Sequence, residues 1–279
     1  MSDMAEKKWY GISITAQDSL VYLVLIILCG VVVIRPLGLP LNVTYETTEY
    51  YDALMSVPEG GVVLYDEAFM VQSYITGSEI AVFRIIFDLI REKNIKFIVV
   101  SSCVDGPLGG AMIEKLLAEG VDKTGTTYGE DYVNFGWLPG FELVLAAISK
   151  DIQTLAETDA YGTPISEIPM MKGLATTDID LFGFSCGVSC DPWMRQWSPL
   201  GKPILMSGGS SLISQAMGYY EAGVITAYLN GGRGLAELEK IYGQYTVATA
   251  LMDASNLVSI YGILLIIGVN GFYWMRRKK

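Results

Sequence analysis

Apolar residues form long uninterrupted stretches at both ends of the chain and short clusters in the middle. At the ends, residues 20–34 and 257–275 are almost free of charged or strongly polar side chains. In the middle, short apolar runs rich in β-branched residues, such as 62–65 and 96–100, each precede a segment in which apolar residues recur at helical spacing. This alternation of strand and helix predicts parallel strands joined by right-handed crossovers.

The same patterns predict the remaining elements of the middle region. We expect strands over residues 62–65, 96–100, 179–185 and 203–206, and helices over residues 76–93, 108–119, 141–152, 212–229 and 231–242. Residues 125–140 are expected to be loop or short strand, and the proline-containing segment 158–171 a surface excursion. The predicted fold class is α/β: a three-layer domain on a mostly parallel sheet, flanked by N- and C-terminal transmembrane helices.

The first apolar stretch is short for a membrane span. Its 15 residues, 20–34, cover roughly 22 Å as a helix, against a hydrocarbon core of about 30 Å. Either residues 11–16 add a turn, or Arg35 snorkels to the interface. A cleaved signal peptide is the alternative, because Lys7 and Lys8 form a basic start, but no small-x-small cleavage site follows. We expect an uncleaved spanning helix over residues 20–41.

The second apolar stretch has the features of a complete span. It is long enough, carries Tyr273 and Trp274 at its end, and is followed by four basic residues. Positive charge next to a span favours the cytoplasmic side. We therefore expect a cytoplasmic N-terminus (1–19), transmembrane helices at 20–41 and 256–275, an extracytoplasmic α/β domain (42–255) and a cytoplasmic basic tail (276–279).

The composition is typical of a membrane protein, and it excludes several kinds of catalytic and metal site. Charged residues make up 18% of the chain and the mean hydropathy is +0.38. The chain has no histidine, which excludes Ser-His-Asp and Cys-His catalysis as well as zinc and haem sites that need imidazole. Residues 36–255 contain 27 acidic and 12 basic side chains, so nucleic acid is not an expected partner.

Polar residues follow each of the four predicted strands, at the edge of a parallel sheet where ligands bind. The four segments are 66–67, 101–105, 185–191 and 207–211. Within them we predict a ligand site at Asp66, Glu67, Ser102, Asp105, Ser207, Gly208 and Gly209. Carboxylates and hydroxyls would suit a hard cation, but no calcium-loop spacing occurs, and aspartate at a strand end is often a cap. No metal and no cofactor are therefore predicted.

The turn 207–211 has two interpretations. Its glycines and serines could hold an anion on backbone amides at the start of a helix, although the lysine of a Walker loop is missing. We favour a tight connection in which Ser210 or Ser211 caps the helix. Among the cysteines expected outside the cytoplasm, Cys186 could pair with Cys190, or Cys103 with either, leaving one thiol unpaired. We interpret these cysteines as structural or as small buried apolar residues, since a catalytic cysteine would lack a histidine base.

Two resemblances to known families can be recognised. The run Lys202–Gly209, followed by Gly218-Tyr219-Tyr220, and the segment Asp105–Gly110 resemble the signal peptide peptidase A family. That resemblance implies a membrane-anchored Ser-Lys protease of crotonase-like fold, with Ser207, Ser210 or Ser211 as nucleophile and Lys202 as the nearest candidate base. The family's contiguous Ser-Gly-Gly-Tyr-Tyr and its Gly-Ser-Ile-Gly segment are missing here.

A second resemblance covers nearly the whole chain. It is carried by Tyr128–Gly136 with Pro139-Gly140, by 159–171 with its Tyr-Gly-Thr-Pro and Ile-Pro-Met-Met motifs, by Gly231–Glu239 and by Met252-Asp253-Ala254. In these marks the chain resembles a family of uncharacterised, double-spanning membrane proteins from archaea and bacteria. This resemblance implies a membrane protein with an extracytoplasmic α/β domain, and it implies no activity.

Two functions from different classes follow. The first is a non-enzymatic binding or assembly protein held in the lipid bilayer by both termini. Glycines at 30, 262, 268 and 271 permit close helix packing, and Asn270 offers an interhelical hydrogen bond, so a homo-oligomer or a membrane-protein complex is expected. The alternative is a membrane-bound Ser-Lys hydrolase of the signal peptide peptidase A kind.

Overall fold

The computed structural model describes residues 7–9, 12–14, 16–67, 79–103, 126–187 and 189–277. These form two compact units, Leu41–Gln244 and the two ends Met1–Pro40 with Tyr245–Lys279. Asp105, the helix predicted over 108–119 and the start of the helix predicted at 76 lie outside the described residues.

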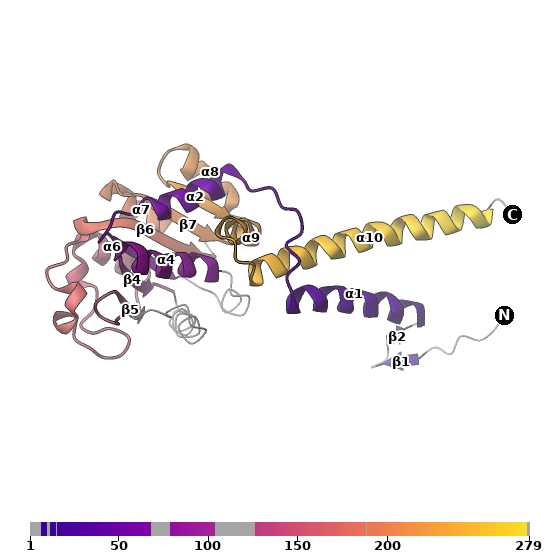
Figure 1. Ribbon diagram of the computed structural model, residues 1–279, viewed down its shortest axis with the longest axis horizontal. Helices are drawn as coiled ribbons and strands as arrows, with labels where there is room; N and C mark the ends of the chain where they lie inside the picture. Colours follow the sequence, from indigo (N-terminus) through magenta and orange to yellow (C-terminus); the bar gives the residue numbers. More distant parts are fainter. Residues whose placement is uncertain are drawn as a thin grey trace. The chain divides into compact units, whose positions relative to one another are not determined.

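The larger unit is built on a six-stranded parallel sheet (Figure 1). Its strands are β3 (Val62–Glu67), β4 (Lys96–Ser101), β5 (Tyr132–Trp137), β6 (Ile179–Cys186), β7 (Ile204–Gly208) and β8 (Ala227–Asn230). Their spatial order is β5-β4-β3-β6-β7-β8. The chain thus builds outward from β3 to β5, returns to the other side of β3, and builds outward again to β8. The predicted α/β class and parallel sheet are confirmed.

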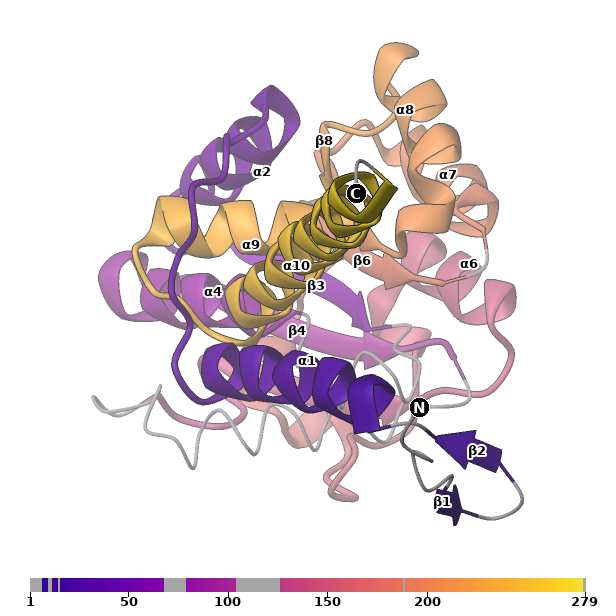
Figure 2. The ribbon, with the colours of Figure 1, turned by 90° about the vertical axis from the view of Figure 1, so that its right-hand side faces the viewer.

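Helices cover both faces of this sheet and make the three layers (Figure 2). One face carries α2 (Tyr45–Met55), α4 (Ile80–Lys93) and α9 (Gly231–Tyr242). The other carries α6 (Glu142–Lys150), α7 (Asp191–Trp197) and α8 (Ile213–Glu221). Aromatic side chains join the layers: Phe87 packs edge-on against Phe97 of β4, and Trp193 stacks on Phe184 of β6.

Short 3-10 helices occupy the connections. The segment between α6 and β6 contains η1 (Ile152–Thr154), η2 (Ile165–Glu167), η3 (Pro169–Met171) and η4 (Thr176–Asp178). Its prolines at the start of η3 and before η2 suit such turns, because they fix φ and lack an N–H. The remaining two are η5 (Ser198–Leu200) and η6 (Ser210–Leu212).

The structure differs from the expected elements at several places, and helix α7 is among the elements that were not predicted. The helix expected over 212–229 is shorter: α8 ends at Glu221, and the chain turns at Gly223, whose φ of +68° suits glycine, into the sixth strand, β8. Helix α2 was not predicted, because its sequence is mostly polar and only Thr47, Tyr50 and Leu54 are buried. Glu237 of α9 anchors it by accepting hydrogen bonds from both Thr44 and Thr47.

The smaller unit combines the two ends of the chain. It contains the antiparallel hairpin of β1 (Lys7–Trp9) and β2 (Ile12–Ile14), helix α1 (Ala16–Ile34) and helix α10 (Val247–Arg277). Helices α1 and α10 lie in contact. Among the described residues, one helix segment, Val247–Met275 of α10, is long and apolar enough to cross a membrane, whereas the apolar part of α1, Ser19–Ile34, is shorter. A second spanning helix is thus not shown.

A buried carboxylate joins the two ends within this unit. Asp253 of α10 accepts hydrogen bonds from the backbone N–H groups of Leu37, Gly38 and Leu39, at 2.7, 2.9 and 2.9 Å. Gly38 adopts a φ of +64°, and a Cβ there would lie 2.7 Å from the ring of Tyr245. The segment that follows α1 is therefore fixed to the first turns of α10.

Candidate functional site

The carboxyl ends of four neighbouring strands meet at one edge of the sheet. In the strand register Glu67 of β3 lies beside Ser185 of β6, and Ser185 lies beside Ser207 of β7. Strand β4 places Ser102 next to the end of β3, since its backbone N–H bonds to Asp66. The strand order reverses between β3 and β6, which is where open parallel sheets bind ligands. The predicted residues Asp66, Glu67, Ser102 and Ser207 are thus brought together.

Asp66 and Glu67 are consecutive in a strand and therefore point to opposite faces of the sheet. Asp66 faces α7 and is fully buried. Its Oδ1 accepts a hydrogen bond from the Ser102 N–H at 2.9 Å. Its Oδ2 accepts from the Ser102 hydroxyl at 2.6 Å and from the Trp193 indole N–H at 2.8 Å. The Asp66 carboxylate is therefore satisfied by three donors.

Burial dominates the titration of Asp66. It raises the pKa of this carboxyl from 3.8 to about 6, and the hydrogen bonds from Ser102 and Trp193 oppose that rise by stabilising the charged form. Asp66 thus becomes ionised between mildly acidic and neutral pH, with its charge held by fixed donors.

The opposite face of the same edge carries a second polar group, made by Glu67, Ser185, Ser207, Tyr65 and Glu79. The Tyr65 and Ser207 hydroxyls share a hydrogen bond of 2.7 Å, and Ser207 also donates to Glu79 Oε1 at 3.3 Å. Glu79 immediately precedes α4, so this helix begins at the site. All five side chains are buried.

Glu67 is the least satisfied member of this group. Both of its carboxyl oxygens, and the hydroxyl of the neighbouring Ser185, have no hydrogen-bond partner within the part of the chain that the structure describes. Burial raises the pKa of Glu67 well above 4.5, and the carboxylates of Glu79 and Asp66 raise it further. Buried polar atoms without partners are rare in folded proteins, and each calls for an explanation such as a bound ligand or water.

A glycine in β6 makes room for this arrangement. The Tyr65 ring lies over Gly183, where a Cβ would be 2.3 Å from the ring. Only a residue without a side chain fits there, and the tyrosine hydroxyl can then reach Ser207. Tyr65 and Glu79 were absent from the predicted site, and Ser185 was named only as the start of a strand-end segment and not as a site residue. Counting alternate residues back from the strand ends would have indicated Tyr65, and aligning the ends of β3 and β6 would have indicated Ser185.

The other predicted residues lie apart from these two groups. Gly208 ends β7 and is half-buried, whereas Gly209, Ser210 and Ser211 are exposed in the following turn. Neither Ser210 nor Ser211 caps a helix: Gly209 precedes η6, Leu212 precedes α8, and neither start has a side-chain cap. The predicted tight connection between strand and helix is confirmed, but the predicted serine cap is wrong, because the chain enters α8 through a 3-10 turn.

The arrangement weighs against a Ser-Lys pair. Lys202 precedes the first residue of β7, at the amino edge of the sheet, while Ser207 lies near the carboxyl end of the same strand. An extended chain places these residues roughly 16 Å apart, beyond the reach of a lysine side chain. Ser210 and Ser211 follow at the carboxyl edge, so Lys202 lies at the wrong edge to activate any of the three serines.

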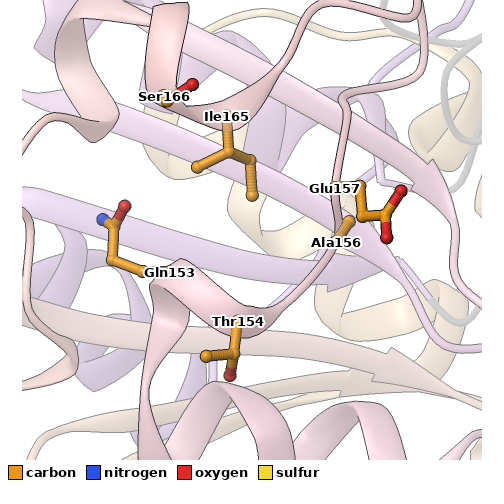
Figure 3. A pocket seen from close by; sticks show the side chains of 6 residues that line it. All are labelled: Gln153, Thr154, Ala156, Glu157, Ile165 and Ser166. Atoms are coloured by element: carbon orange, nitrogen blue, oxygen red, sulfur yellow. The ribbon is translucent and has the colours of Figure 1, made fainter.

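Within the described ranges no group of three or more Cys, Asp or Glu side chains has the geometry of a metal site. A surface hollow of about 540 Å³ lies in the segment between α6 and β6, lined by Gln153, Thr154, Ala156, Glu157, Ile165 and Ser166 (Figure 3). It contains none of the strand-end residues.

Comparison with known proteins finds no family model and no curated sequence that matches the chain.

Proposed function

We propose that the protein is a membrane-anchored binding protein whose α/β domain holds a small ligand at the carboxyl edge of the sheet, between β3 and β6. The observation that carries the proposal is the Glu67 carboxyl: fully buried, without a hydrogen-bond partner among the described residues, and beside the equally unpartnered Ser185 hydroxyl. Burying a carboxyl group without a hydrogen-bond partner lowers the stability of the folded protein, so a structural role does not account for Glu67 at this position.

The charges around Glu67 define the class of ligand. Glu79 and Asp66 add negative potential at Glu67, as the direction of its pKa shift shows. A protonated amine would be attracted by that potential and could donate hydrogen bonds to Glu67 and Ser185. We therefore propose a small organic ligand that carries an ammonium group. Its binding would ionise Glu67 and release a proton.

Ligand binding can be tested on the full-length protein in detergent. Thermal unfolding would be followed with small amines and with alcohols of matched size, for example putrescine against butane-1,4-diol. We expect amines, and not the alcohols, to raise the unfolding temperature of the wild type. This effect should be lost in Glu67→Gln and weakened in Ser185→Ala. The exposed Glu59 provides the matched control, since it precedes β3 at the amino edge of the sheet, the edge opposite Glu67.

The following results would contradict the proposal. If no amine in a broad set stabilises the wild type, or if Glu67→Gln responds as the wild type does, Glu67 is not the ligand contact. A reduced amine response in Glu59→Gln would mean that bulk negative charge, rather than the site, attracts the ligand.

The anchoring half of the proposal rests on α10, whose Val247–Met275 segment can span a membrane. With residues 20–41 as a second span, both termini would be cytoplasmic and the α/β domain extracytoplasmic. Close packing of the two spans within a homo-oligomer or a larger membrane complex completes the proposal. Protease added to intact cells should then cut within 42–255 and spare an epitope placed after Met275. Cleavage of the epitope with an intact domain would reverse the orientation.

A further inference from the structure

On the face opposite Glu67, three sulfur atoms lie together at the same edge of the sheet. Cys186 Sγ at the end of β6 is 3.8 Å from Cys190 Sγ, which directly precedes α7. Cys190 Sγ is in turn 3.4 Å from the thioether sulfur of Met206 in β7. All three side chains are buried, and both cysteines are free thiols.

The separations suit a shared ion. Metal–sulfur bonds of about 2.3 Å place two sulfurs of one ion about 3.8 to 4 Å apart at tetrahedral or trigonal angles. The two thiols already have that separation, and Cys190 lies within reach of both other sulfurs. The flexible thioether of Met206 can adjust its distance by rotating about its side-chain bonds.

The residues around the sulfurs hold them in place. The Cys190 N–H donates to Gln215 Oε1 at 2.9 Å, and Gln215 Nε2 donates to Asp191 Oδ1 at 2.6 Å. Gly208 lies beside Cys186 in the register, and a Cβ there would approach Met206 Cε to 2.9 Å. Helix α8 thus fixes the backbone of Cys190, and the missing side chain at Gly208 leaves space for the Met206 methyl group. Metal ligands are commonly oriented by such surrounding contacts.

The donor set selects the ion. Thiolate and thioether sulfurs favour soft ions, with Cu(I) foremost among those that accept a thioether. Zinc, nickel and Cu(II) sites commonly use imidazole, and this chain has no histidine. We infer that Cys186, Cys190 and Met206 form a binding site for Cu(I).

Binding at this site exchanges protons for the metal without a change in oxidation state. The two S–H bonds of the cysteines break, and three sulfur–copper bonds form, two from the thiolates and one from the thioether of Met206. Two protons pass to the solvent, and the ion remains Cu(I). Because two protons are released for each ion bound, acid should weaken copper binding.

The test uses the full-length, reduced protein in detergent without oxygen, titrated with Cu(I) in competition with a chromophoric Cu(I) chelator. We expect one bound ion per chain, released protons, and X-ray absorption showing only sulfur neighbours at about 2.3 Å. Cys186→Ser and Cys190→Ser should each weaken binding by more than about 100-fold, and Met206→Leu by a smaller factor. Cys29→Ser, in helix α1, is the matched control and should bind as the wild type does.

Several results would overturn the inference. In the first, the wild-type protein does not compete with the chelator for Cu(I). In the second, a Cys186→Ser, Cys190→Ser double variant binds Cu(I) as tightly as the wild type does. A third is Zn²⁺ binding at the same residues as tightly as Cu(I), which would show that the donors do not select a soft monovalent ion. A fourth is a Cys186–Cys190 disulfide in freshly purified protein that shows no copper affinity after reduction. If the cysteine variants fail to fold, Met206→Leu and the absorption spectrum of the wild type decide the question.

Discussion

Replacing Glu67 by glutamine should make the protein more stable at neutral pH. The two side chains have nearly the same shape, but only glutamate ionises. Its protonation state can therefore differ between the folded and the unfolded chain. In the folded protein, burial and the carboxylates of Glu79 and Asp66 raise the Glu67 pKa well above the 4.5 of an exposed glutamate. The folded chain therefore holds a proton on Glu67 that the unfolded chain has already released.

The direction and size of the effect follow from this difference. Because the folded-state pKa is raised, the contribution of Glu67 to stability is fully present below pH 4.5 and is lost as the pH rises towards the folded-state pKa. Over that window the wild type loses about 1.4 kcal/mol of unfolding free energy per pH unit relative to Glu67→Gln. The two proteins should be equally stable near pH 4 and should diverge steadily at higher pH.

Denaturant unfolding of the full-length protein in detergent, at several pH values from 4 to 8, measures this divergence. The fluorescence of Trp193 and Trp197, both fully buried in the α/β unit, reports the transition. Glu59→Gln removes an exposed acid and should follow the wild type at every pH. A Glu67→Gln protein that is less stable than wild type, or whose stability difference does not change with pH, would refute the reasoning, because Glu67 would then be ionised and paired in the folded state.

Three more predictions follow from the contacts. Asp66→Asn should remove the pH dependence that arises between 3.8 and about 6, worth roughly 3 kcal/mol, seen as a flatter stability curve over that range. Gly183→Ala should cost about 3 kcal/mol in denaturant unfolding, because its Cβ would lie 2.3 Å from the Tyr65 ring, and a change below 0.5 kcal/mol would contradict that packing. Asp253→Asn should weaken the hold on three backbone N–H groups by about 2 kcal/mol, measured as faster amide hydrogen exchange at residues 37–39.

The fold could be predicted where one face or stripe of an element is apolar. Strands such as β3 and β4 are buried on both faces and stand out as unbroken apolar runs, and α9 shows a clear helical period. Helix α2 lacked that signal, since its docking depends on hydrogen bonds from residues 44 and 47 to Glu237, almost 200 residues away in the sequence. Strand β8 was hidden because its four residues continue an apolar run from α8.

The site could be predicted only as far as the edge of the sheet. Strand ends are visible in the sequence, which is why Asp66, Glu67, Ser102 and Ser207 were selected. The face on which each side chain lies, and its partners, depend on the order of the strands in space. Glu79 resembles a helix-capping residue in the sequence, but its burial beside Ser207 depends on β7 lying two strands away from β3.

Asp66 and Glu67 are neighbouring acids in β3 that differ in their hydrogen bonding. This difference indicates a structural role for Asp66 and a ligand-binding role for Glu67. Both carboxyl oxygens of Asp66 accept hydrogen bonds, from Ser102 and from Trp193. These bonds join β4 and α7 to β3, and they explain the burial of Asp66. Glu67 is equally buried, yet it makes no such bond within the described residues. If the edge served stability alone, an apolar side chain at position 67 would serve better, because it would avoid the cost of burying a carboxyl. A ligand that completes the hydrogen bonds of Glu67 explains why the acid is there.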